Sequence, residues 1–280
     1  MYCDLHTHSV YSDGTLTPSQ LVSEAAGQNL VIALTDHNTA AGLPAFLQEA
    51  QLWGVTAVAG VELSTVYEDR ELHLLGLFAE PETFSAIDAL TARYHRLKQD
   101  SVRAMVERLR RDGYAIVYDA ICQSTPNGNL NRAHIASALV DKRYVNSTKD
   151  ALRTLLREGG GYYVPPERLP ISEALHFLRE IRTVPVLAHP LKELTPDALR
   201  QILPQLQRDG LLGMEVQHTS YDRQTADTAL SIAAEFGLLP SGGSDFHGAA
   251  KPGVALGSGK GNVAVPIRYY EDLLQKKQQL

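Results

Sequence analysis

Residues 30–37 read LVIALTDH, an apolar run rich in β-branched residues that ends on an aspartate and a histidine. Residues 183–190, TVPVLAHP, have the same character in the second half of the chain. Nearly continuous apolar runs of this kind are typical of strands buried on both faces, as in a barrel or a doubly wound sheet. These two segments therefore indicate an α/β fold with a buried sheet.

Further segments of this kind lie on either side of these two, at residues 2–8, 55–64, 71–78, 210–218 and 238–247. Amphipathic helical patterns separate several of them. The first helix begins with Thr17-Pro18-Ser19-Gln20, in which Thr17 can cap the helix, Pro18 can take the first helical position and Gln20 can complete a capping box. Alternation of strands and helices predicts parallel pairing, and the count gives seven strands.

The middle third of the chain interrupts this alternation. From about residue 92 to residue 168 the sequence is charged, with apolar residues three and four positions apart, which predicts helices. We therefore expect a helical insertion at 92–168 between two parts of the sheet domain, 1–91 and 169–280. The glycine-rich segments 159–163 and 257–261 do not fit the spacing of a P-loop, and we interpret both as flexible connections.

The composition excludes several classes of function. With 26 basic and 32 acidic side chains, the net charge of -6 argues against sequence-independent binding of long duplex DNA, which depends on Lys and Arg. It does not exclude small phosphorylated substrates, because bound metal ions can supply positive charge. The first residues resemble no secretory signal and no apolar run approaches about 18 residues, so we expect a cytoplasmic protein without a membrane partner.

The two cysteines, Cys3 and Cys122, are too few for a disulfide framework, and we expect Cys3 to be a buried thiol. The sequence predicts no particular oligomeric state.

Histidines and carboxylates gather at the ends of the predicted strands. Seven of the ten histidines lie at or just after the C-terminal end of a predicted strand: His6, His8, His37, His73, His189, His218 and His247. The carboxylates found there are Asp13, Asp36, Glu62 and Asp245. In parallel α/β folds such strand ends form one mouth, so residues far apart in the sequence meet there.

This set of side chains predicts a metal site. Imidazole and carboxylate groups together suit zinc, manganese or iron. In extended segments His6 and His8 point to one side, as do Asp245 and His247. Any single histidine could instead be a hydrogen-bonded core residue, but burying the whole set without cations would leave unpaired polar groups.

The chemistry expected of such a site is phosphate-ester hydrolysis. Two or more ions about 3.5–4 Å apart can hold a water as hydroxide and clamp phosphate oxygens during in-line displacement. Amide hydrolysis and deamination use similar ligands, usually with one or two ions and a separate carboxylate base. The number of candidate ligands favours phosphate esters.

Several motifs, in chain order, resemble those of the PHP (polymerase and histidinol phosphatase) family of metal-dependent phosphoesterases. They are DLHTHSVYSDGTLTP, LTDHNTAAGL, GVELS, HLLGLF, NRAHIASALV, VLAHP and GGSDFHG. The resemblance spans essentially the whole chain and implies a distorted seven-stranded (β/α)7 TIM-like barrel with a helical insertion. The R-x-H-I-A element at 132–136 is similar to the branch that includes nucleoside 3′,5′-bisphosphate phosphatases and the 5′-to-3′ exoribonuclease RNase AM.

The resemblance also implies three divalent ions, Mn²⁺, Fe²⁺ or Zn²⁺, each with its own ligands. The first ion would be held by His6, His8, Glu62 and Asp245. Glu62 would bridge to a second ion held by His73 and His189, and a third would be held by Asp13, His37 and His247. Among these ligands the catalytic residues would be Asp13, His37, Glu62, Asp245 and His247.

The favoured substrate is a nucleoside 3′,5′-bisphosphate, which would lose its 3′-phosphate to a metal-bridging hydroxide. Arg132 and His134, in a cap formed by the insertion, are the expected phosphate contacts, since Arg offers planar paired donors. Both could instead be local structural residues of a helix start. His218 is expected either to contact substrate or to be structural, and Asp4 and Asp36 to orient imidazoles.

The closest rival substrate is the 5′ end of a short RNA or DNA oligonucleotide, followed by histidinol phosphate. A different class of function, a metal-binding accessory module without catalysis, is disfavoured because every ligand position is intact.

Overall fold

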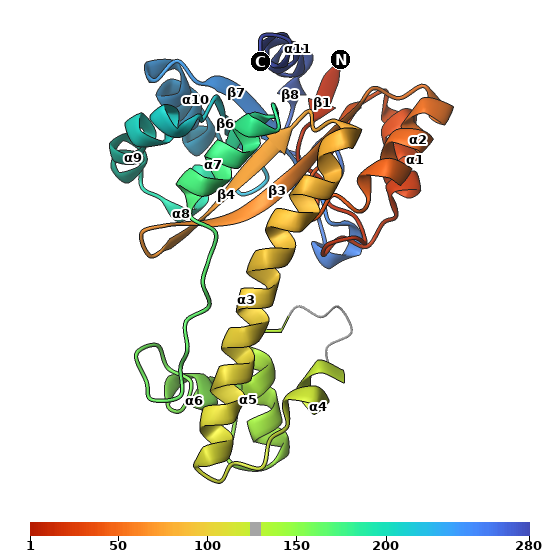
Figure 1. The fold of residues 1–280 in the computed structure, drawn as a ribbon. Coiled ribbons are helices and arrows are strands. Elements are labelled where there is room, and N and C mark those ends of the chain that lie inside the picture. The colour runs from red at the N-terminus through yellow and green to blue at the C-terminus, as the bar shows by residue number, and fades with distance from the viewer. Residues whose placement is uncertain (124–129) are drawn as a thin grey trace. The chain divides into compact units, whose positions relative to one another are not determined.

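The computed structural model describes residues 1–123 and 130–280 and divides into two compact units. One unit comprises Met1–Ala89 and Leu169–Leu280, and the other comprises Leu90–Arg168. The first unit contains an eight-stranded sheet in the order β7-β6-β5-β4-β3-β2-β1-β8 (Figure 1). The sequence prediction placed the corresponding boundaries at 91/92 and 168/169.

All seven predicted strands are present. They are β1 (Tyr2–Asp4), β2 (Val31–Leu34), β3 (Ala57–Tyr67), β4 (Arg70–Leu77), β5 (Val184–Ala188), β6 (Gly213–His218) and β7 (Leu239–Gly243). A short β8 (Val265–Pro266) pairs antiparallel with β1.

Backbone contacts between the segments after β1 and β7 bring the two ends of the seven-stranded array together. The Leu5 amide donates to Gly242 O at 3.1 Å, and the Asp245 amide donates to His6 O at 2.9 Å. Thr7 and Phe246 form a parallel bridge in the same region. The sheet is therefore a nearly closed barrel, as the sequence predicted, and the C-terminal ends of β1 and β7 lie side by side.

The expectation of parallel pairing throughout is wrong for β4. This strand runs antiparallel to both β3 and β5, because a tight turn through Glu68, which has a φ of 52°, joins β3 directly to β4 without a crossover helix. His73 pairs with Ser64 of β3 and with Ala188 of β5. The beginning of β4 therefore lies at the same barrel end as the C-terminal ends of its neighbours, and His73 is not at the C-terminal end of its strand.

Helices surround the barrel. They are α1 (Pro18–Gln28), α2 (Leu43–Trp53), α7 (Ile171–Glu180), α8 (Pro190–Glu193), α9 (Pro196–Asp209), α10 (Arg223–Glu235) and α11 (Ile267–Lys277), with 3-10 turns η1 (Pro81–Thr83) and η2 (Gly248–Ala250). The predicted capping box of α1 is confirmed, since the Gln20 amide donates to Thr17 Oγ1 and the Thr17 amide donates to Gln20 Oε1.

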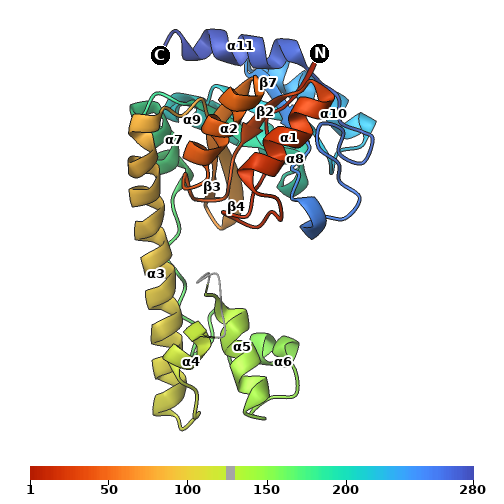
Figure 2. The same ribbon diagram turned by 90° about the vertical axis from the view of Figure 1, so that its right-hand side faces the viewer.

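Helix α11 closes the barrel end that lies away from the predicted mouth (Figure 2). The Ile267 amide donates to Met1 O, just before β1, and Lys277 Nζ donates to Arg182 O, just before β5. Helix α11 thereby covers the N-terminal ends of the parallel strands, which leaves their C-terminal ends and the beginning of β4 to form the mouth. Cys3 is fully buried, as expected.

The second unit is helical, as the sequence predicted. Helix α3 (Phe84–Arg111) leads into it, and α4 (Tyr118–Gln123), α5 (Arg132–Asp141) and α6 (Thr148–Arg153) follow. It has its own apolar core, which includes Met105, Leu109, Ile135, Leu139 and Leu156. Across the described residues of both units, none of the helices combines the length and apolar character needed to cross a membrane.

The glycine-rich segment 257–261 is a bonded turn rather than the flexible connection expected. Gly257 and Gly259 adopt φ values of 74° and 60°, and Ala255 and Gly259 exchange backbone hydrogen bonds. The Gly257 amide also donates to Asp4 Oδ2 at 2.8 Å. The hydrogen bond with Asp4 ties this turn to the end of strand β1. The glycines allow the left-handed backbone conformation that the turn requires.

Gly243 is required at the closure because a β-carbon there would lie 2.5 Å from both the backbone nitrogen and the Cβ of His6. We expect Gly243→Ala to lower the free energy of unfolding of the metal-free protein by about 1–3 kcal/mol, since backbone must shift to admit the methyl group. Urea unfolding measures this. The matched control is Gly27→Ala in α1, where nothing lies within 4 Å; it should raise stability by about 0.5–1 kcal/mol. Equal stability of Gly243→Ala and the wild type would contradict the proposed closure.

Candidate metal centre

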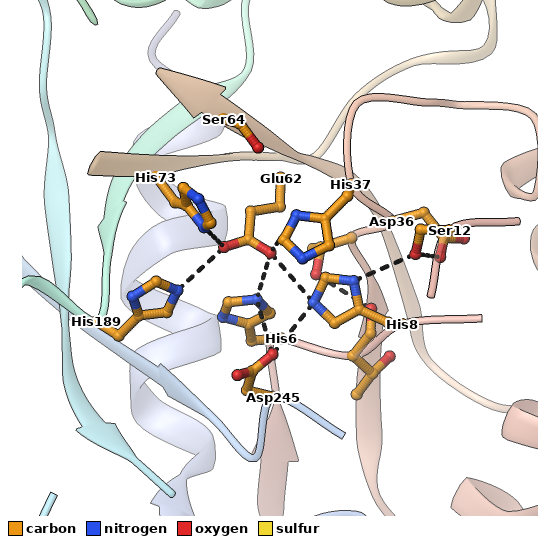
Figure 3. A network of polar contacts seen from close by, with 12 residues as sticks. His6, His8, Ser12, Asp36, His37, Glu62, Ser64, His73, His189 and Asp245 are labelled. Atoms are coloured by element: carbon orange, nitrogen blue, oxygen red, sulfur yellow. Dashed lines mark hydrogen bonds and ion pairs between the residues drawn. The ribbon is translucent and has the colours of Figure 1, made fainter. Parts of the chain in front are cut away.

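All nine candidate ligands belong to the first unit and meet at one end of the barrel. They come from the segments after β1, β2, β5 and β7 and from within β3 and β4: His6, His8, Asp13, His37, Glu62, His73, His189, Asp245 and His247. Neighbouring imidazoles lie as close as 4.1 Å between ring centroids, for His8 and His247. The rings surround the carboxylate of Glu62 (Figure 3).

Glu62 is the centre of this cluster. Its side chain is 1% exposed and its two oxygens lie within 3.2 Å of five imidazole nitrogens. The distances are 3.0 Å to His6 Nε2, 3.2 Å to His8 Nε2, 3.1 Å to His37 Nδ1, 2.7 Å to His73 Nδ1 and 3.1 Å to His189 Nε2. Burial raises the pKa of Glu62, but the charge of His6 and hydrogen bonds with His189 and His6 outweigh it and hold the pKa well below its usual range. Glu62 is therefore an ionised carboxylate.

The two oxygens of Asp245 face different partners. Oδ1 lies 3.3 Å from His8 Nε2 and 3.6 Å from His6 Nε2, toward the centre of the cluster. Oδ2 lies 3.2 Å from His218 Nε2 and 2.6 Å from Lys251 Nζ. Although burial raises the pKa of Asp245, the hydrogen bond with His218 and the nearby His8 and His6 rings lower it well below its ordinary value. The inner oxygen can thus serve an ion while the outer one is held by side chains.

Asp245 reaches the cluster by a different backbone path from the one expected. Strand β7 ends at Gly243, and Asp245 has a φ of 54°, in the left-handed region. The segment 245–247 is therefore not extended, and alternation along a strand does not explain why both side chains point inward. His189 shares this conformation with a φ of 32°. Non-glycine residues in this region are strained and concentrate at functional sites.

Asp13 is the exposed carboxylate of the set, with 57% of its side chain accessible. Its Oδ1 lies 3.1 Å from His247 Nε2, and its Oδ2 lies 3.9 Å from His37 Nε2. Partial burial raises the pKa of Asp13, but the adjacent His247 and His37 rings lower it below its usual value. Asp13 therefore marks the solvent side of the cluster.

The side chains form overlapping groups whose ligand atoms lie within 4.8 Å of one another. These groups are His8, Asp13, His37 and His247; His6, His8 and Asp245; His37, Glu62 and His73; and His6, His189 and Glu215. Three of the four contain only predicted ligands. Their membership differs from the predicted sets, because Glu62 groups with His37 and His73, while His189 groups with Glu215.

The donor set fits divalent cations. Four ring nitrogens are buried without a hydrogen-bond partner: His8 Nε2, His37 Nδ1, His189 Nδ1 and His247 Nε2. Three of these nitrogens lie 3.1–3.3 Å from a carboxylate oxygen, but not in hydrogen-bonding geometry. Burying unpaired polar groups is costly, and a cation between nitrogen and carboxylate oxygen would satisfy both.

Two neighbouring rings have pKa values displaced in opposite directions. Burial lowers the pKa of His37 to about 4. The neighbouring His73 ring is also buried, but hydrogen bonds with Glu62 and Glu71 raise its pKa to about 9. Their ring centroids are only 5.4 Å apart. Neutral imidazole is the metal-binding form, so the low pKa of His37 favours its role as a ligand.

Sequence reasoning missed Glu215, a fully buried carboxylate in β6. Its Oε1 lies 3.0 Å from His6 Nδ1, and its Oε2 accepts the His189 amide at 2.7 Å. Burial raises the pKa of Glu215, but the charge of His6 and their hydrogen bond lower it below its ordinary value. An ionised Glu215 favours a proton on His6 Nδ1, which would leave Nε2, 3.0 Å from Glu62 Oε2, available to bind an ion.

A bulge in β6 hides Glu215 from pattern analysis. The pairing with β7 shifts between Glu215 and Gln217, so that Glu215 opposes Ser241 and His218 opposes Gly243. In a regular strand two residues three positions apart point to opposite faces. The bulge allows Glu215 and His218 both to face the cluster. The available signal was a lone carboxylate within the apolar run GLLGMEVQH.

Asp4 does not have the role expected of it, and Asp36 has that role only through Ser12. Asp4 accepts bonds from the Ser244 amide, the Ser244 hydroxyl and the Gly257 amide, so it fixes loops and not an imidazole. Asp36 accepts the hydroxyl of Ser12, whose oxygen lies 3.5 Å from His8 Nδ1 (Figure 3). Only Asp36, through Ser12, approaches a ligand histidine in the manner predicted.

The three predicted substrate contacts lie in two different units. His218 is 3% exposed, accepts the Ser220 amide on Nδ1 and faces Asp245 through Nε2. Arg132 and His134 belong to the second unit. There Arg132 Nη2 lies 3.0 Å from Glu158 Oε1, and His134 Nδ1 accepts the Asn131 amide at the start of α5. A substrate contact by any of the three stays a prediction.

Comparison with known proteins gives consistent results. The chain matches the PHP domain family over residues 4–164. A 5′–3′ exoribonuclease of Haemophilus influenzae is 31% identical over 246 residues, covering 87% of this chain and 89% of the relative. A 3′,5′-nucleoside bisphosphate phosphatase of Chromobacterium violaceum is 30% identical over 258 residues, covering 91% and 90% of the two chains.

Solved structures agree with these relatives. A protein described as a metal-dependent phosphoesterase from Bifidobacterium adolescentis superposes with a TM-score of 0.69 at 29% identity, covering 98% of this chain and 96% of its own. A Chromobacterium violaceum protein, described as an amidohydrolase with bound sulfate and no metal, also gives a TM-score of 0.69, at 26% identity and with 99% and 97% coverage.

Metal loading should stabilise the first unit. Adding Mn²⁺ to the chelator-treated protein at about 100 times its dissociation constant contributes about 2.7 kcal/mol, which should raise Tm by about 5–10 °C. His247→Ala should lose much of this shift, because His247 Nε2 is one of the unpartnered nitrogens. The control His176→Ala removes a histidine whose side chain is 64% exposed and should keep the shift. Scanning calorimetry measures all three, and a wild type without any shift would contradict the metal site.

Glu215 should control metal affinity although it was not among the predicted ligands. We expect Glu215→Gln, which keeps the shape and loses the charge, to weaken Mn²⁺ binding about 10- to 100-fold. Titration against a chelator of known affinity gives this ratio. The control is Ser241→Ala, since Ser241 opposes Glu215 in β7 and its buried hydroxyl has no hydrogen-bond partner. Unchanged affinity in Glu215→Gln would show that the carboxylate does not support His6.

Proposed function

The chain belongs to the PHP domain family and is a hydrolase of phosphate esters, and from this premise we propose that it removes the 3′-phosphate of nucleoside 3′,5′-bisphosphates. The observation that carries the proposal is the meeting of nine predicted imidazole and carboxylate ligands at one barrel end. A relative that shares 30% of its residues over 91% of this chain is a 3′,5′-nucleoside bisphosphate phosphatase.

We further propose three divalent ions, Mn²⁺, Fe²⁺ or Zn²⁺, held by the nine ligands. Such ions supply the electrostatic stabilisation of phosphoryl transfer and the activation of water near neutral pH. Glu62 and Asp245 would help to hold the ions as ionised carboxylates. Asp13, the exposed member of the set, would face incoming substrate.

In the reaction, water adds to phosphorus and the bond to the ribose 3′ oxygen breaks. The leaving oxygen takes up a proton, and inorganic phosphate and a nucleoside 5′-phosphate are released. The buried pair of His218 and Asp245 holds its proton on His218 Nε2, because the Ser220 amide occupies Nδ1. His218 therefore helps to position Asp245.

The helical insertion is proposed to select substrate as a cap. Arg132 is half-buried at the start of α5, with its guanidinium 5.2 Å from the ring centroid of Tyr163. A guanidinium stacked on an aromatic ring keeps donors free for phosphate oxygens. The ion pair with Glu158, whose side chain is 66% exposed, is weak enough to exchange for such an anion. His134 would act beside it.

A second candidate is 5′-to-3′ exonuclease activity on short RNA or DNA. It is favoured by the exoribonuclease relative, which shares 31% identity over 87% of the chain. Both activities hydrolyse a phosphate ester beside another phosphate, so one site can serve both if the mouth admits a chain. Histidinol phosphate ranks lower because it lacks the second phosphate, and a non-catalytic accessory module lacks support from the intact ligand set.

Phosphate release from a substrate panel tests these candidates. With Mn²⁺ added, we expect the highest kcat/KM on a 3′,5′-bisphosphate, compared with a mononucleotide, a 5′-phosphorylated oligonucleotide and histidinol phosphate. His6→Ala should lose at least about 100-fold, because loss of a ligand exceeds the effect of losing its support. Preference for the oligonucleotide would select the exonuclease. No turnover by metal-loaded protein would leave only the accessory module.

A further inference from the structure

We propose that Lys251 is a substrate-binding residue that contacts a phosphate oxygen at the metal centre. The proposal rests on the proposed phosphoesterase function and adds a contact within the first unit. Lys251 was not among the residues singled out in the sequence. It follows the η2 turn, four residues after the candidate ligand His247.

The backbone of this segment is fixed beside the metal centre. The Thr15 hydroxyl donates to His247 O at 3.3 Å and accepts the Ala249 amide at 2.8 Å. The Lys251 amide closes the turn onto Gly248 O at 3.3 Å. Because Thr15 follows the loop that carries Asp13, the base of the Lys251 side chain is tied to the two segments that supply the exposed ligands.

The ammonium group approaches the cluster from the solvent side. Lys251 Nζ lies 2.6 Å from Asp245 Oδ2, and the Lys251 side chain is 40% exposed while that of Asp245 is 9% exposed. Within the described residues, Lys251 is the one Lys or Arg in an ion pair with a carboxylate of the cluster. Lys251 is therefore the basic side chain that places a positive charge beside the cluster on its solvent side.

Metal binding would change the electrostatic surroundings of the Lys251 ammonium. Divalent ions near the inner oxygen of Asp245 would neutralise the carboxylate and add positive charge near the ammonium. Lys251 would then lose most of its attraction to Asp245 and require another anion. The phosphate of a substrate at the metal centre would supply that anion. The flexible four-carbon stem allows the ammonium to move from carboxylate to phosphate without backbone motion.

A purely structural role gives a different outcome. If Lys251 served only to hold Asp245, its loss would weaken metal binding, and phosphate binding would fall as a consequence. If it contacts phosphate, its loss would weaken phosphate binding at full metal occupancy. His218 Nε2 would continue to hold Asp245 Oδ2 at 3.2 Å in either case. Metal content and phosphate affinity therefore separate the two roles.

The experiment compares Lys251→Met, which keeps length without charge, with Lys251→Arg, which keeps charge. Each full-length protein is loaded with Mn²⁺, its metal content is measured by elemental analysis, and inorganic phosphate is titrated by calorimetry. We expect unchanged metal content, a phosphate Kd about 10- to 100-fold higher in Lys251→Met, and recovery of most of this loss in Lys251→Arg. The matched control is Lys260→Met, an exposed lysine of the nearby turn, which should bind phosphate like the wild type.

Three results would overturn the proposal. Unchanged phosphate affinity in Lys251→Met would show that Lys251 does not contact phosphate. Reduced metal content would show that Lys251 supports Asp245 instead. An equal loss in Lys260→Met would reduce the effect to general electrostatics. None of these depends on turnover. A wild type that binds phosphate with the expected dependence on Lys251, yet releases none from any nucleotide, would reject the proposed function and retain the phosphate contact.

Discussion

The structure of the first unit depends on compensating one buried negative charge, the carboxylate of Glu62. Five imidazole nitrogens within 3.2 Å surround it, and they come from segments associated with strands β1, β2, β4 and β5. An isolated buried carboxylate would cost far more than a domain's net stability can absorb. The segments that carry these imidazoles must therefore surround Glu62 for the burial of its charge to be tolerated. The barrel fold that brings these segments together also assembles the metal centre.

A second layer of residues contacts the candidate ligands from outside the cluster. Glu215 fixes His6, Ser12 with Asp36 approaches His8, and His218 holds the outer oxygen of Asp245. Each support binds the atom that faces away from the centre. The inward atoms, among them His8 Nε2 and His37 Nδ1, are left without hydrogen bonds. This division is what a metal site requires, because supports that bound the inward atoms would compete with the ions.

Sequence patterns predicted the strands well and picked out the imidazole and carboxylate side chains that meet at one barrel end, because buried strands and strand-end histidines are local signals. Where prediction failed, the cause was a feature of backbone geometry that residue spacing does not encode. His73 was expected at a C-terminal strand end, but the turn at Glu68 reverses β4 and delivers it from the beginning of the strand. Glu215 was missed because a bulge changes which face it occupies. Asp4 was expected to orient an imidazole, but its carboxylate accepts hydrogen bonds from Ser244 and from Gly257 of the turn at 257–261, and residue spacing does not reveal either contact.

The net charge of -6 and the proposed anionic substrates are compatible for a reason that lies in this geometry. Without ions, Asp13, Glu62, Asp245 and Glu215 place four ionised carboxylates at the mouth, and a phosphate would be repelled. Bound ions would reverse the local field, so affinity for phosphate would become conditional on metal occupancy. Lys251 would follow the same rule, since its ammonium pairs with Asp245 and would be released once that carboxylate is neutralised. On the proposed function, ions bind before substrate, and an acidic chain acquires a site for phosphate without a basic surface that would attract long nucleic acids indiscriminately.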